Sequence, residues 1–306
     1  MKAFKGALPR LLLPLLLLSG AATAAQDPEK TLQHGGVART YLLHLPRGYD
    51  AAKPWPLVAA LHGGGGTAKS TNTLAHMNAA ADRHGFIVAY PQALYRHWND
   101  GRQSGVADSR KVDDLGFLSA LIDQIARDYN VDRKRVFATG ISNGGFMSQR
   151  LACDLAGKIT AIAAVAATMG RDLSAHCKPS QPVSVLIIQG TEDPLVPYEG
   201  GRVQVRGGGA IISAPDAVQK WVELNGCKAQ PLVADLPDKA ADGTRTRRET
   251  HSGCRQRTEV VFLRVEGGGH TWPGGVPYLP ERRIGRTSRD FDATEVIWEF
   301  FASRQR

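Results

Sequence analysis

The stretch Thr139-Gly140-Ile141-Ser142-Asn143-Gly144-Gly145 decides the fold. It carries the pattern Gly-x-Ser-x-Gly and lies between a predicted strand over residues 135–139 and a predicted helix over 146–155. A tight strand-to-helix turn presents its serine side chain outward, and the flanking glycines relieve crowding in that turn. The helix that follows directs its N-terminal N–H groups toward developing negative charge. The pattern predicts a nucleophilic Ser142. The alternative is an ordinary turn in a chain that holds 33 glycines.

Strand-like and helix-like segments alternate outward from this turn. Strands are predicted over residues 41–45, 57–61, 86–90, 135–139, 159–167, 183–188 and 260–265, and helices over 112–129, 146–155, 214–224 and 293–301. Short apolar runs that end at Gly or Pro are typical of buried parallel strands, whereas 41–45 alternates like an edge strand. The order predicts an α/β fold, with a mostly parallel central sheet covered by helices on both faces.

Three polar or glycine-rich stretches, residues 95–111, 199–213 and 230–257, are predicted to be loops over this sheet. Loops on a rigid scaffold usually carry specificity. We find no internal repeat or long linker, so residues 26–306 are predicted to form one domain.

The first 25 residues have a different composition from the rest. Lys2, Lys5 and Arg10 precede an apolar run over 11–18, and Ala22-Thr23-Ala24 follows it. This order is typical of a secretory signal peptide, and the run is too short to span a bilayer. The alternative is an N-terminal amphipathic helix. We expect cleavage near residue 25, a secreted protein in the periplasm or the medium, and no membrane partner.

The basic charge invites a nucleic-acid interpretation, because the formal net charge is +9 and the pI is about 9.5. Loss of the three cations in the leader lowers the net charge to +6. The remaining arginines lack the aromatic interleaving of a nucleic-acid surface, so no nucleic-acid partner is expected. Arg282, Arg283, Arg286 and Arg289 form one cluster. They are interpreted either as a basic rim that favours acidic substrates or as a solvated surface.

The four cysteines are Cys153, Cys177, Cys227 and Cys254. They form no close Cys-x-x-Cys or Cys/His cluster, which argues against a zinc site. In an oxidising compartment two disulfides are the default. Three pairings are possible and the sequence does not choose among them. Sequential pairing, which closes two loops of about 25 residues, is favoured.

A second glycine-rich turn, Leu61-His62-Gly63-Gly64-Gly65-Gly66, follows a predicted buried strand. Such a turn lets backbone N–H groups come close to a ligand, and here it would supply one oxyanion donor near Gly64. The other donor would be the N–H of Asn143. His62 is expected to support the turn. Phosphate binding is disfavoured because Ala68 precedes Lys69-Ser70 where the pattern Gly-x-x-x-x-Gly-Lys-Ser/Thr requires a glycine, and because no Gly-x-Gly-x-x-Gly pattern is present.

An acid and a base follow later in the chain, each just after a predicted strand. Asp193 follows Gly190, and its position before Pro194 also suits a plain turn. The chain order Ser, Asp, His requires an acid in this interval. We favour Asp193 over its neighbour Glu192. His270 comes later in the chain than Asp193, lies in a glycine-rich turn of its own, and is the predicted base. In this mechanism His270 takes the proton of Ser142 and Asp193 orients the imidazole, with no metal or cofactor.

Together these motifs resemble the secreted esterases of the polyhydroxybutyrate-depolymerase and feruloyl-esterase family. The resemblance spans roughly residues 40–302 and rests on these segments: Leu61-His62-Gly63-Gly64-Gly65, Asp113-Asp114-Leu115-Gly116-Phe117, Gly140-Ile141-Ser142-Asn143-Gly144-Gly145, Gly268-Gly269-His270-Thr271-Trp272-Pro273-Gly274-Gly275, Tyr278-Leu279-Pro280, Thr287-Ser288-Arg289-Asp290 and Asp292-Ala293-Thr294. It implies an α/β-hydrolase fold, the triad Ser142, Asp193 and His270, and the two sequential disulfides. Many relatives carry Cys or another residue in the turn after His62, so the oxyanion donor itself stays open.

Three further residues have two interpretations each. Trp98 and Trp272 either line the substrate pocket or pack in the core, where Trp is usually buried. Asp114 either braces the site or simply starts a helix.

The function expected from these motifs is a secreted serine esterase, active as a monomer. No polymer-binding module is expected. The expected substrates are therefore small soluble esters, or feruloyl and acetyl groups on plant polysaccharide, or short hydroxyalkanoate esters. Alternatives are a true polyhydroxybutyrate depolymerase, an acyltransferase with the same triad, an inactive carbohydrate-binding relative and a serine peptidase. The complete triad argues against the inactive relative.

Overall fold

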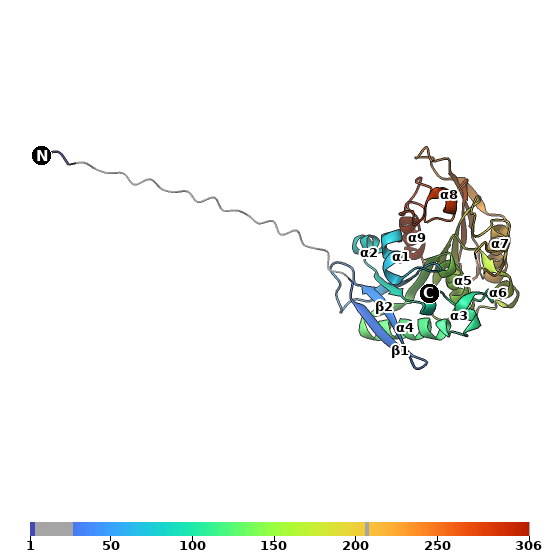
Figure 1. Ribbon diagram of the computed structural model, residues 1–306, viewed down its shortest axis with the longest axis horizontal. Coiled ribbons are helices and arrows are strands. Elements are labelled where there is room, and N and C mark those ends of the chain that lie inside the picture. The colour runs from blue at the N-terminus through green and yellow to red at the C-terminus, as the bar shows by residue number, and fades with distance from the viewer. Residues whose placement is uncertain (4–26, 206–207, 306) are drawn as a thin grey trace.

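A sheet of ten strands runs through the part of the chain that the computed structural model describes, residues 1–3, 27–205 and 208–305 (Figure 1). Its strands are β1 (Glu29–His34), β2 (Val37–His44), β3 (Trp55–Leu61), β4 (Ile87–Pro91), β5 (Val131–Ile141), β6 (Ala161–Val165), β8 (Ser184–Gly190), β11 (Leu232–Asp235), β12 (Arg245–His251) and β13 (Val260–Glu266). Their order is β1-β2-β4-β3-β5-β6-β8-β13-β12-β11. The signal peptide predicted over residues 1–25 lies, beyond residue 3, outside the described residues.

The six strands from β4 to β13 in this order are parallel, and the two flanks are antiparallel. This confirms the predicted α/β class with a mostly parallel central sheet. Two details were wrong. The segment 41–45 is not at the edge, because β1 pairs with β2 outside it. The hairpin β11–β12 lies within the predicted loop 230–257, since an antiparallel flank needs few apolar residues to form.

Nine helices lie within the described ranges, and they flank the sheet (Figure 1). They are α1 (Ala68–Ala75), α2 (Met77–His84), α3 (Gly105–Ser109), α4 (Asp114–Asp128), α5 (Asn143–Asp154), α6 (Arg171–His176), α7 (Ala214–Asn225), α8 (Glu281–Ile284) and α9 (Ala293–Ala302). The helices α4, α5, α7 and α9 match predicted helices, whereas the short α1, α2, α3, α6 and α8 were not expected. No described helix is both long and apolar enough to cross a bilayer.

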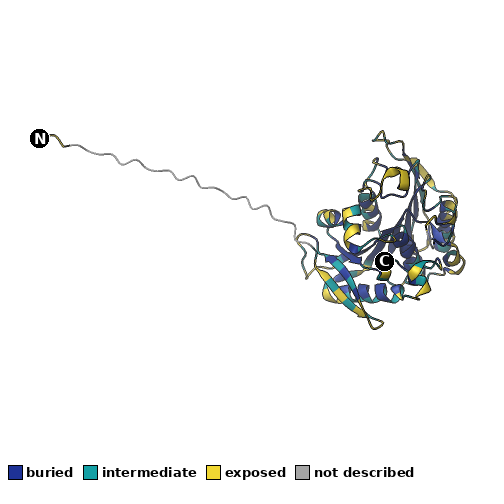
Figure 2. Ribbon diagram, viewed as in Figure 1, coloured by how far each residue is buried: buried dark blue, intermediate teal, exposed yellow. Residues whose placement is uncertain are grey.

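Alternate residues of the central strands supply two cores, as the period of two in a strand requires. Leu57 and Ala59 of β3 face one way and pack with α4, α5 and α7. Val58 and Ala60 face the other way and pack with α1, α2 and α9. The sheet is therefore buried on both faces, and Figure 2 shows its central strands in the colour of buried residues. The turns that carry Ser142, Asp193 and His270 begin at the carboxyl ends of β5, β8 and β13.

A small sheet lies beside helix α5. It contains β7 (Met169–Gly170), β10 (Ala210–Ile212) and β9 (Gly201–Arg202), all antiparallel. Two of these strands lie in the predicted loop 199–213. They give that loop a fixed backbone where it approaches the site.

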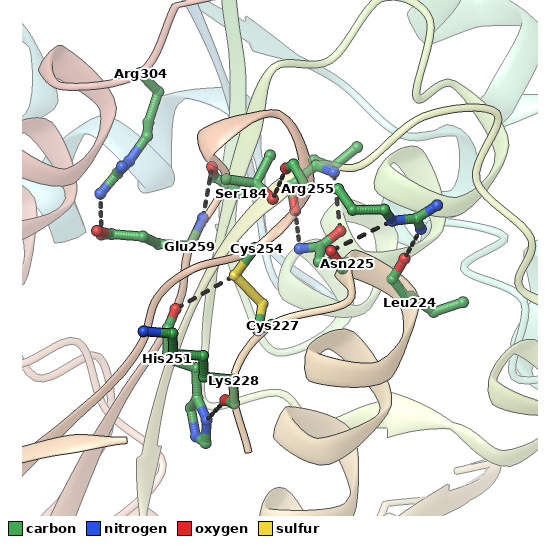
Figure 3. Close-up of a disulfide and its surroundings, with 12 residues drawn as sticks. Ser184, Leu224, Asn225, Cys227, Lys228, His251, Cys254, Arg255, Glu259 and Arg304 are labelled. Carbon is green, nitrogen blue, oxygen red and sulfur yellow. Dashed lines mark hydrogen bonds and ion pairs between the residues drawn. A yellow bond between two sulfur atoms is a disulfide. The ribbon is translucent and has the colours of Figure 1, made fainter. Parts of the chain in front are cut away.

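The two disulfides pair sequentially, as predicted. Cys153 joins Cys177 and so ties the end of α5 to the end of α6. Cys227 joins Cys254 and ties the end of α7 to the turn after β12 (Figure 3). Asn225 lies beside this second disulfide, and its amide donates a hydrogen bond to the Val183 carbonyl at 2.7 Å. Both disulfides therefore anchor helices that cover the sheet.

Candidate active site

Ser142 occupies the turn between β5 and α5 with a backbone conformation that is rare for a residue other than glycine. Its φ is 55° and its ψ is −121°. Such outliers cost about 1–3 kcal/mol and persist only where the surroundings fix them. Here the surroundings include a close approach of two backbones, because a Cβ on Gly144 would lie 2.2 Å from the Leu61 carbonyl oxygen. The glycine next to Asn143 lets the serine turn pack directly on the end of β3.

The side chain of Asn143 clamps the first turn of α5 to the loop after β4. Its Oδ1 accepts a hydrogen bond from the Trp98 N–H at 2.7 Å. Its Nδ2 donates to the Trp98 carbonyl at 3.0 Å and to Asp100 Oδ2 at 2.6 Å. All three residues are buried. The backbone N–H of Asn143, at the first position of the helix, has no partner within the helix and borders the cavity.

Gly64 lies opposite this N–H, in the turn after β3 that lines the same cavity. Within the described residues, no group accepts a hydrogen bond from its N–H. The turn is held by its neighbours, since the Gly65 N–H donates to the Arg96 carbonyl at 2.8 Å. The structure thus brings the two predicted oxyanion donors to one cavity.

His62 supports this turn from below, as predicted. Its Nδ1 donates to the Gly63 carbonyl at 2.8 Å, and its Nε2 accepts from the Ala93 N–H at 3.1 Å. Because the ring is buried, its pKa is lowered to about 4. The imidazole is therefore neutral at neutral pH, and its two nitrogens are occupied by protein groups.

Asp193 and His270 form a buried pair at the ends of β8 and β13. His270 Nδ1 lies 2.8 Å from Asp193 Oδ2. The other carboxylate oxygen, Oδ1, accepts hydrogen bonds from the N–H groups of Leu195 and Val196, both at 2.8 Å. Gln189 also donates to Oδ2, at 3.1 Å. This arrangement fixes the carboxylate, so Asp193 in turn fixes the orientation of the imidazole.

The loops that carry Asp193 and His270 touch through their backbones. A Cβ on Gly190 would lie 2.2 Å from the Gly268 carbonyl oxygen, so only glycine permits the approach. Glu192, the alternative acid, points elsewhere: it is exposed, and its Oε2 lies 3.4 Å from Nη1 of Arg286.

The turns described above border one cavity of about 790 Å³. Ser142, Asn143, His270 and Gly64 all line it. The other side chains on its wall are mainly apolar or cationic, and they include Ser70, Leu74, Arg96, His97, Arg102, Ile141, Leu195, Val203, Val205, Tyr278 and Leu279. Several come from the loops 95–111 and 199–213, which the sequence indicated as carriers of specificity. The sequence could not single out these residues, because nothing local indicates which loop side chains turn inward.

Trp98 and Trp272 do not line this cavity, so the prediction that they form the substrate pocket was wrong. Both are buried. Trp98 Nε1 donates to the His62 carbonyl at 2.9 Å, and Trp272 Nε1 donates to Thr294 Oγ1 at 3.0 Å. Each tryptophan thus anchors a catalytic turn from behind, because its ring fills the core while its N–H finds an acceptor.

Of the two interpretations of the arginine cluster, the structure supports the solvated surface and not the basic rim. None of Arg282, Arg283, Arg286 and Arg289 lines the cavity. Arg286 is engaged with Glu192 and with Glu281, whose Oε1 lies 3.7 Å from its Nε. The loop after His270 turns Tyr278 and Leu279 toward the cavity instead.

Asp114 both starts a helix and braces the site. It is the first residue of α4 and is buried. Its Oδ1 accepts from Arg39 at 2.6 Å, and its Oδ2 accepts from the Asn99 N–H at 2.7 Å. Burial raises the pKa of this carboxyl, while the two hydrogen bonds oppose that rise. Asn143 and Asp114 together therefore hold residues 98–100 of the loop after β4, Asn143 through Trp98 and Asp100 and Asp114 through Asn99.

Metal-ligating groups do not converge in the described ranges: no set of three or more His, Cys, Asp or Glu is placed to hold an ion there. The polar groups at the cavity include a serine, an imidazole held by a carboxylate, and the backbones of Gly64 and Asn143. These groups are suited to acyl chemistry.

The sequence profile of the family described as esterase PHB depolymerase matches residues 39–195, more than half of the chain. The chain belongs to this family. A putative esterase, NocK, from Nocardia uniformis subsp. tsuyamanensis is 32% identical over 87% of this chain and 79% of its own. Feruloyl esterase C from Emericella nidulans is 31% identical over 95% of this chain and 97% of its own. These relatives support assignment of this member of the esterase PHB depolymerase family as a carboxylic ester hydrolase.

A solved structure supports the fold. The acetyl xylan esterase from Aspergillus awamori superimposes with a TM-score of 0.58 over 90% of this chain and 99% of its own, at 13% identity. At that identity the likeness concerns the architecture alone, and it agrees with the α/β-hydrolase fold.

Proposed function

We propose that this esterase acts through the triad Ser142, His270 and Asp193. One observation carries the proposal: Ser142, strained at the start of α5, shares a cavity with His270, whose far side is hydrogen-bonded to the buried Asp193. A merely structural turn would have no use for a strained serine that faces a cavity with an oriented imidazole. The resemblance in sequence points to the same three residues.

The chemistry follows from the roles of these groups. His270 Nε2 takes the proton of Ser142 as its Oγ attacks the ester carbonyl carbon, and Asp193 stabilises the imidazolium that forms. The N–H groups of Gly64 and Asn143 donate to the oxyanion. Collapse of the tetrahedral intermediate expels the alcohol, which takes its proton from His270. Water, deprotonated by the same His270, then releases the acid and regenerates Ser142.

The proposed substrates are feruloyl- or acetyl-type esters of plant polysaccharide, or short hydroxyalkanoate esters. The mixed apolar and polar wall of the 790 Å³ cavity has room for an aromatic acyl group or a short hydroxyacid chain. The relatives named as feruloyl esterases and the family named for polyhydroxybutyrate support both classes. A polyhydroxybutyrate oligomer depolymerase and an acyltransferase that passes the acyl group to a sugar hydroxyl are the alternatives.

We also propose that the protein is exported and acts as a monomer. The leader-like composition of residues 1–25 and the two disulfides support export to an oxidising compartment.

Substitution Ser142→Ala tests the triad. We expect it to abolish hydrolysis of p-nitrophenyl butyrate while circular dichroism and the melting temperature stay close to those of the unmodified protein. A Ser142→Ala variant that remains active would refute the assignment. Comparing methyl ferulate, acetylated xylan and hydroxybutyrate oligomers as substrates would then identify the ester, and products formed with an added sugar acceptor would reveal a transferase.

A further inference from the structure

A second cavity, of about 530 Å³, adjoins the catalytic one. Arg102 lines both cavities, so the two share a wall. Arg171 and Arg202 line the second cavity as well, and among the described residues of its wall Asp172 is the only carboxylate. We call Arg102, Arg171 and Arg202 the arginine subsite. The proposed mechanism gives these residues no role.

Two of the three arginines in the arginine subsite, Arg171 and Arg202, carry charge that no described carboxylate pairs with, whereas Arg102 is paired with Asp100. Within the described ranges, neither Arg171 nor Arg202 takes part in an ion pair, and both are exposed, whereas Arg245 and Arg247 on β12 are each paired with an aspartate. Arg202 spends one nitrogen, Nη2, on the Gly208 carbonyl at 3.1 Å. The single carboxylate, Asp172, lies 3.6 Å from His176 on its own helix. The cavity wall therefore has a net positive charge.

Arg102 is rigid and connects the arginine subsite to the catalytic turn. Its guanidinium is buried, binds Asp100 through Nε and Nη2 at 2.9 and 2.7 Å, and lies 4.1 Å from the centre of the Phe146 ring. Asp100 in turn accepts from Asn143. The third nitrogen, Nη1, donates to no described residue. A group bound at Nη1 would therefore lie at a fixed place relative to the proposed oxyanion donor.

Two consecutive residues, Arg202 and Val203, show how the arginine subsite lies relative to the scissile bond of a bound ester. Arg202 is the last residue of β9 and faces the second cavity, while the next residue, Val203, faces the catalytic cavity. A substrate whose ester lies at Ser142 can extend past Val203 and reach Arg202. Arg96, on the wall of the catalytic cavity and also without an ion pair in the described ranges, extends the positive charge along this path.

We propose that the arginine subsite binds a carboxylate of the substrate, so that the enzyme selects esters that carry an acid group beyond the scissile bond. This inference rests on the proposed esterase function and names its substrate class. Planar guanidinium groups match the two oxygens of a carboxylate, which is the geometry that arginine recognises best. Two substrates supply such a group, a uronate sugar next to an acylated one and the free acid end of a short hydroxyacid ester.

Binding to the inactive Ser142→Ala protein tests the proposal without any turnover. The probes are the 3-hydroxybutyrate dimer as free acid and as methyl ester, and an acetylated glucuronic acid glycoside in the same two forms, measured by titration calorimetry. We expect the acid form of at least one pair to bind about tenfold more tightly than its methyl ester at low salt. The pair that shows the difference identifies the source of the carboxylate.

Two double variants made in the Ser142→Ala background locate the effect. Arg171→Gln with Arg202→Gln should remove most of the preference for the acid, whereas Arg282→Gln with Arg283→Gln, which lines neither cavity, should keep it. Equal binding of acid and methyl ester in both pairs, or a preference that survives loss of Arg171 and Arg202, would overturn the proposal. Turnover of p-nitrophenyl butyrate by the protein with Ser142 intact reports separately on the esterase function, so the two proposals can fail independently.

Discussion

Two histidine turns at the same edge of the sheet have opposite chemistry. His62 follows β3 and His270 follows β13, each is flanked by glycines, and each ring is almost fully buried. Both ring nitrogens of His62 are hydrogen-bonded to backbone groups, Nδ1 to the Gly63 carbonyl and Nε2 to the Ala93 N–H. His270 has one nitrogen on the carboxylate of Asp193, while its Nε2 meets no partner among the described residues and belongs to the cavity wall.

This difference shows what distinguishes a base from a support. Burial and glycine-rich surroundings are common to both turns, so neither feature marks a catalytic histidine. We infer that the marks of a base are a carboxylate on one nitrogen and a second, unbound nitrogen on the wall of the cavity that holds the serine. His34 and His84 also contact carboxylates but do not line that cavity. Four predictions test this contrast, beginning with the largest expected effect.

Substitution His270→Gln should lower kcat for p-nitrophenyl butyrate by about 10⁴-fold or more, because no other described group on the cavity wall is oriented by a carboxylate to accept the proton of Ser142. Steady-state kinetics measures the loss. The variant His176→Gln, on the exposed face of α6, is the matched control and should retain its activity. A His270→Gln protein within tenfold of the unmodified kcat would place the base elsewhere.

Substitution Asp193→Asn should lower kcat by about 10³- to 10⁴-fold, since an amide would favour the wrong tautomer of His270. The neighbour Glu192→Gln is the control. Because Glu192 is exposed and contacts Arg286, its loss should change kcat by less than about threefold. If Glu192→Gln proved the more damaging of the two, the assignment of the acid would be reversed.

The buried His62 should make stability depend on pH. In the folded protein its pKa is about 4, against 6.5 in the unfolded chain, so the unfolded state takes up a proton that the folded state refuses between these values. The free energy of unfolding should therefore fall by about 3 kcal/mol as the pH is lowered from 6.5 to 4. Burial also lowers the pKa of His97, which adds a decrease of the same sign.

Urea unfolding at several pH values measures this dependence. The difference between the unmodified protein and His62→Gln isolates the contribution of this ring, since the glutamine does not titrate. Identical pH profiles for the two proteins would show that His62 is not held neutral.

The smallest effect concerns the support behind His270. Thr294→Val removes the acceptor of the Trp272 N–H and leaves that buried donor without a partner. We expect a loss of about 1–3 kcal/mol of stability, measured by thermal or urea unfolding. The exposed Thr73→Val on α1 is a control that should change the stability by less than about 0.5 kcal/mol. A Thr294→Val protein as stable as the original would show that Trp272 is anchored by packing alone.

The sequence predicted the centre of the molecule better than its margins. The strands β3, β6 and β8 are almost entirely buried, and β5 and β13 each contain a buried apolar segment, so each gives a short apolar run that stands out. The hairpin β11–β12 is polar and half-exposed, and β11 shows Leu232 and Val233 to solvent. The eight-residue helices α1 and α2 are rich in Thr, Asn and Ala and carry too short a pattern for a periodicity to emerge.

The residues of the site also differ in how well the sequence could predict them. Ser142, Asp193 and His270 could be named from the sequence because each must follow a strand and they must come in a set order. The roles of Trp98 and Trp272 could not, because a tryptophan behind a catalytic turn and one within the pocket lie at the same sequence distance from it. The arginine subsite was not predictable either, because whether an arginine is paired depends on carboxylates far away in the chain. Arg286, in the segment that follows His270, is paired with Glu192 from another loop, whereas Arg202 has no such partner among the described residues.

Covalent trapping of the nucleophile is the most direct test of the central claim that Ser142 is activated by His270. The protein is incubated with a fluorophosphonate, which leaves a stable phosphonyl group on an activated serine, and the modified peptide is identified by mass spectrometry. The account predicts one adduct, on Ser142, that forms far more slowly in His270→Gln. An adduct on another serine, or labelling of Ser142 at an equal rate without His270, would contradict it.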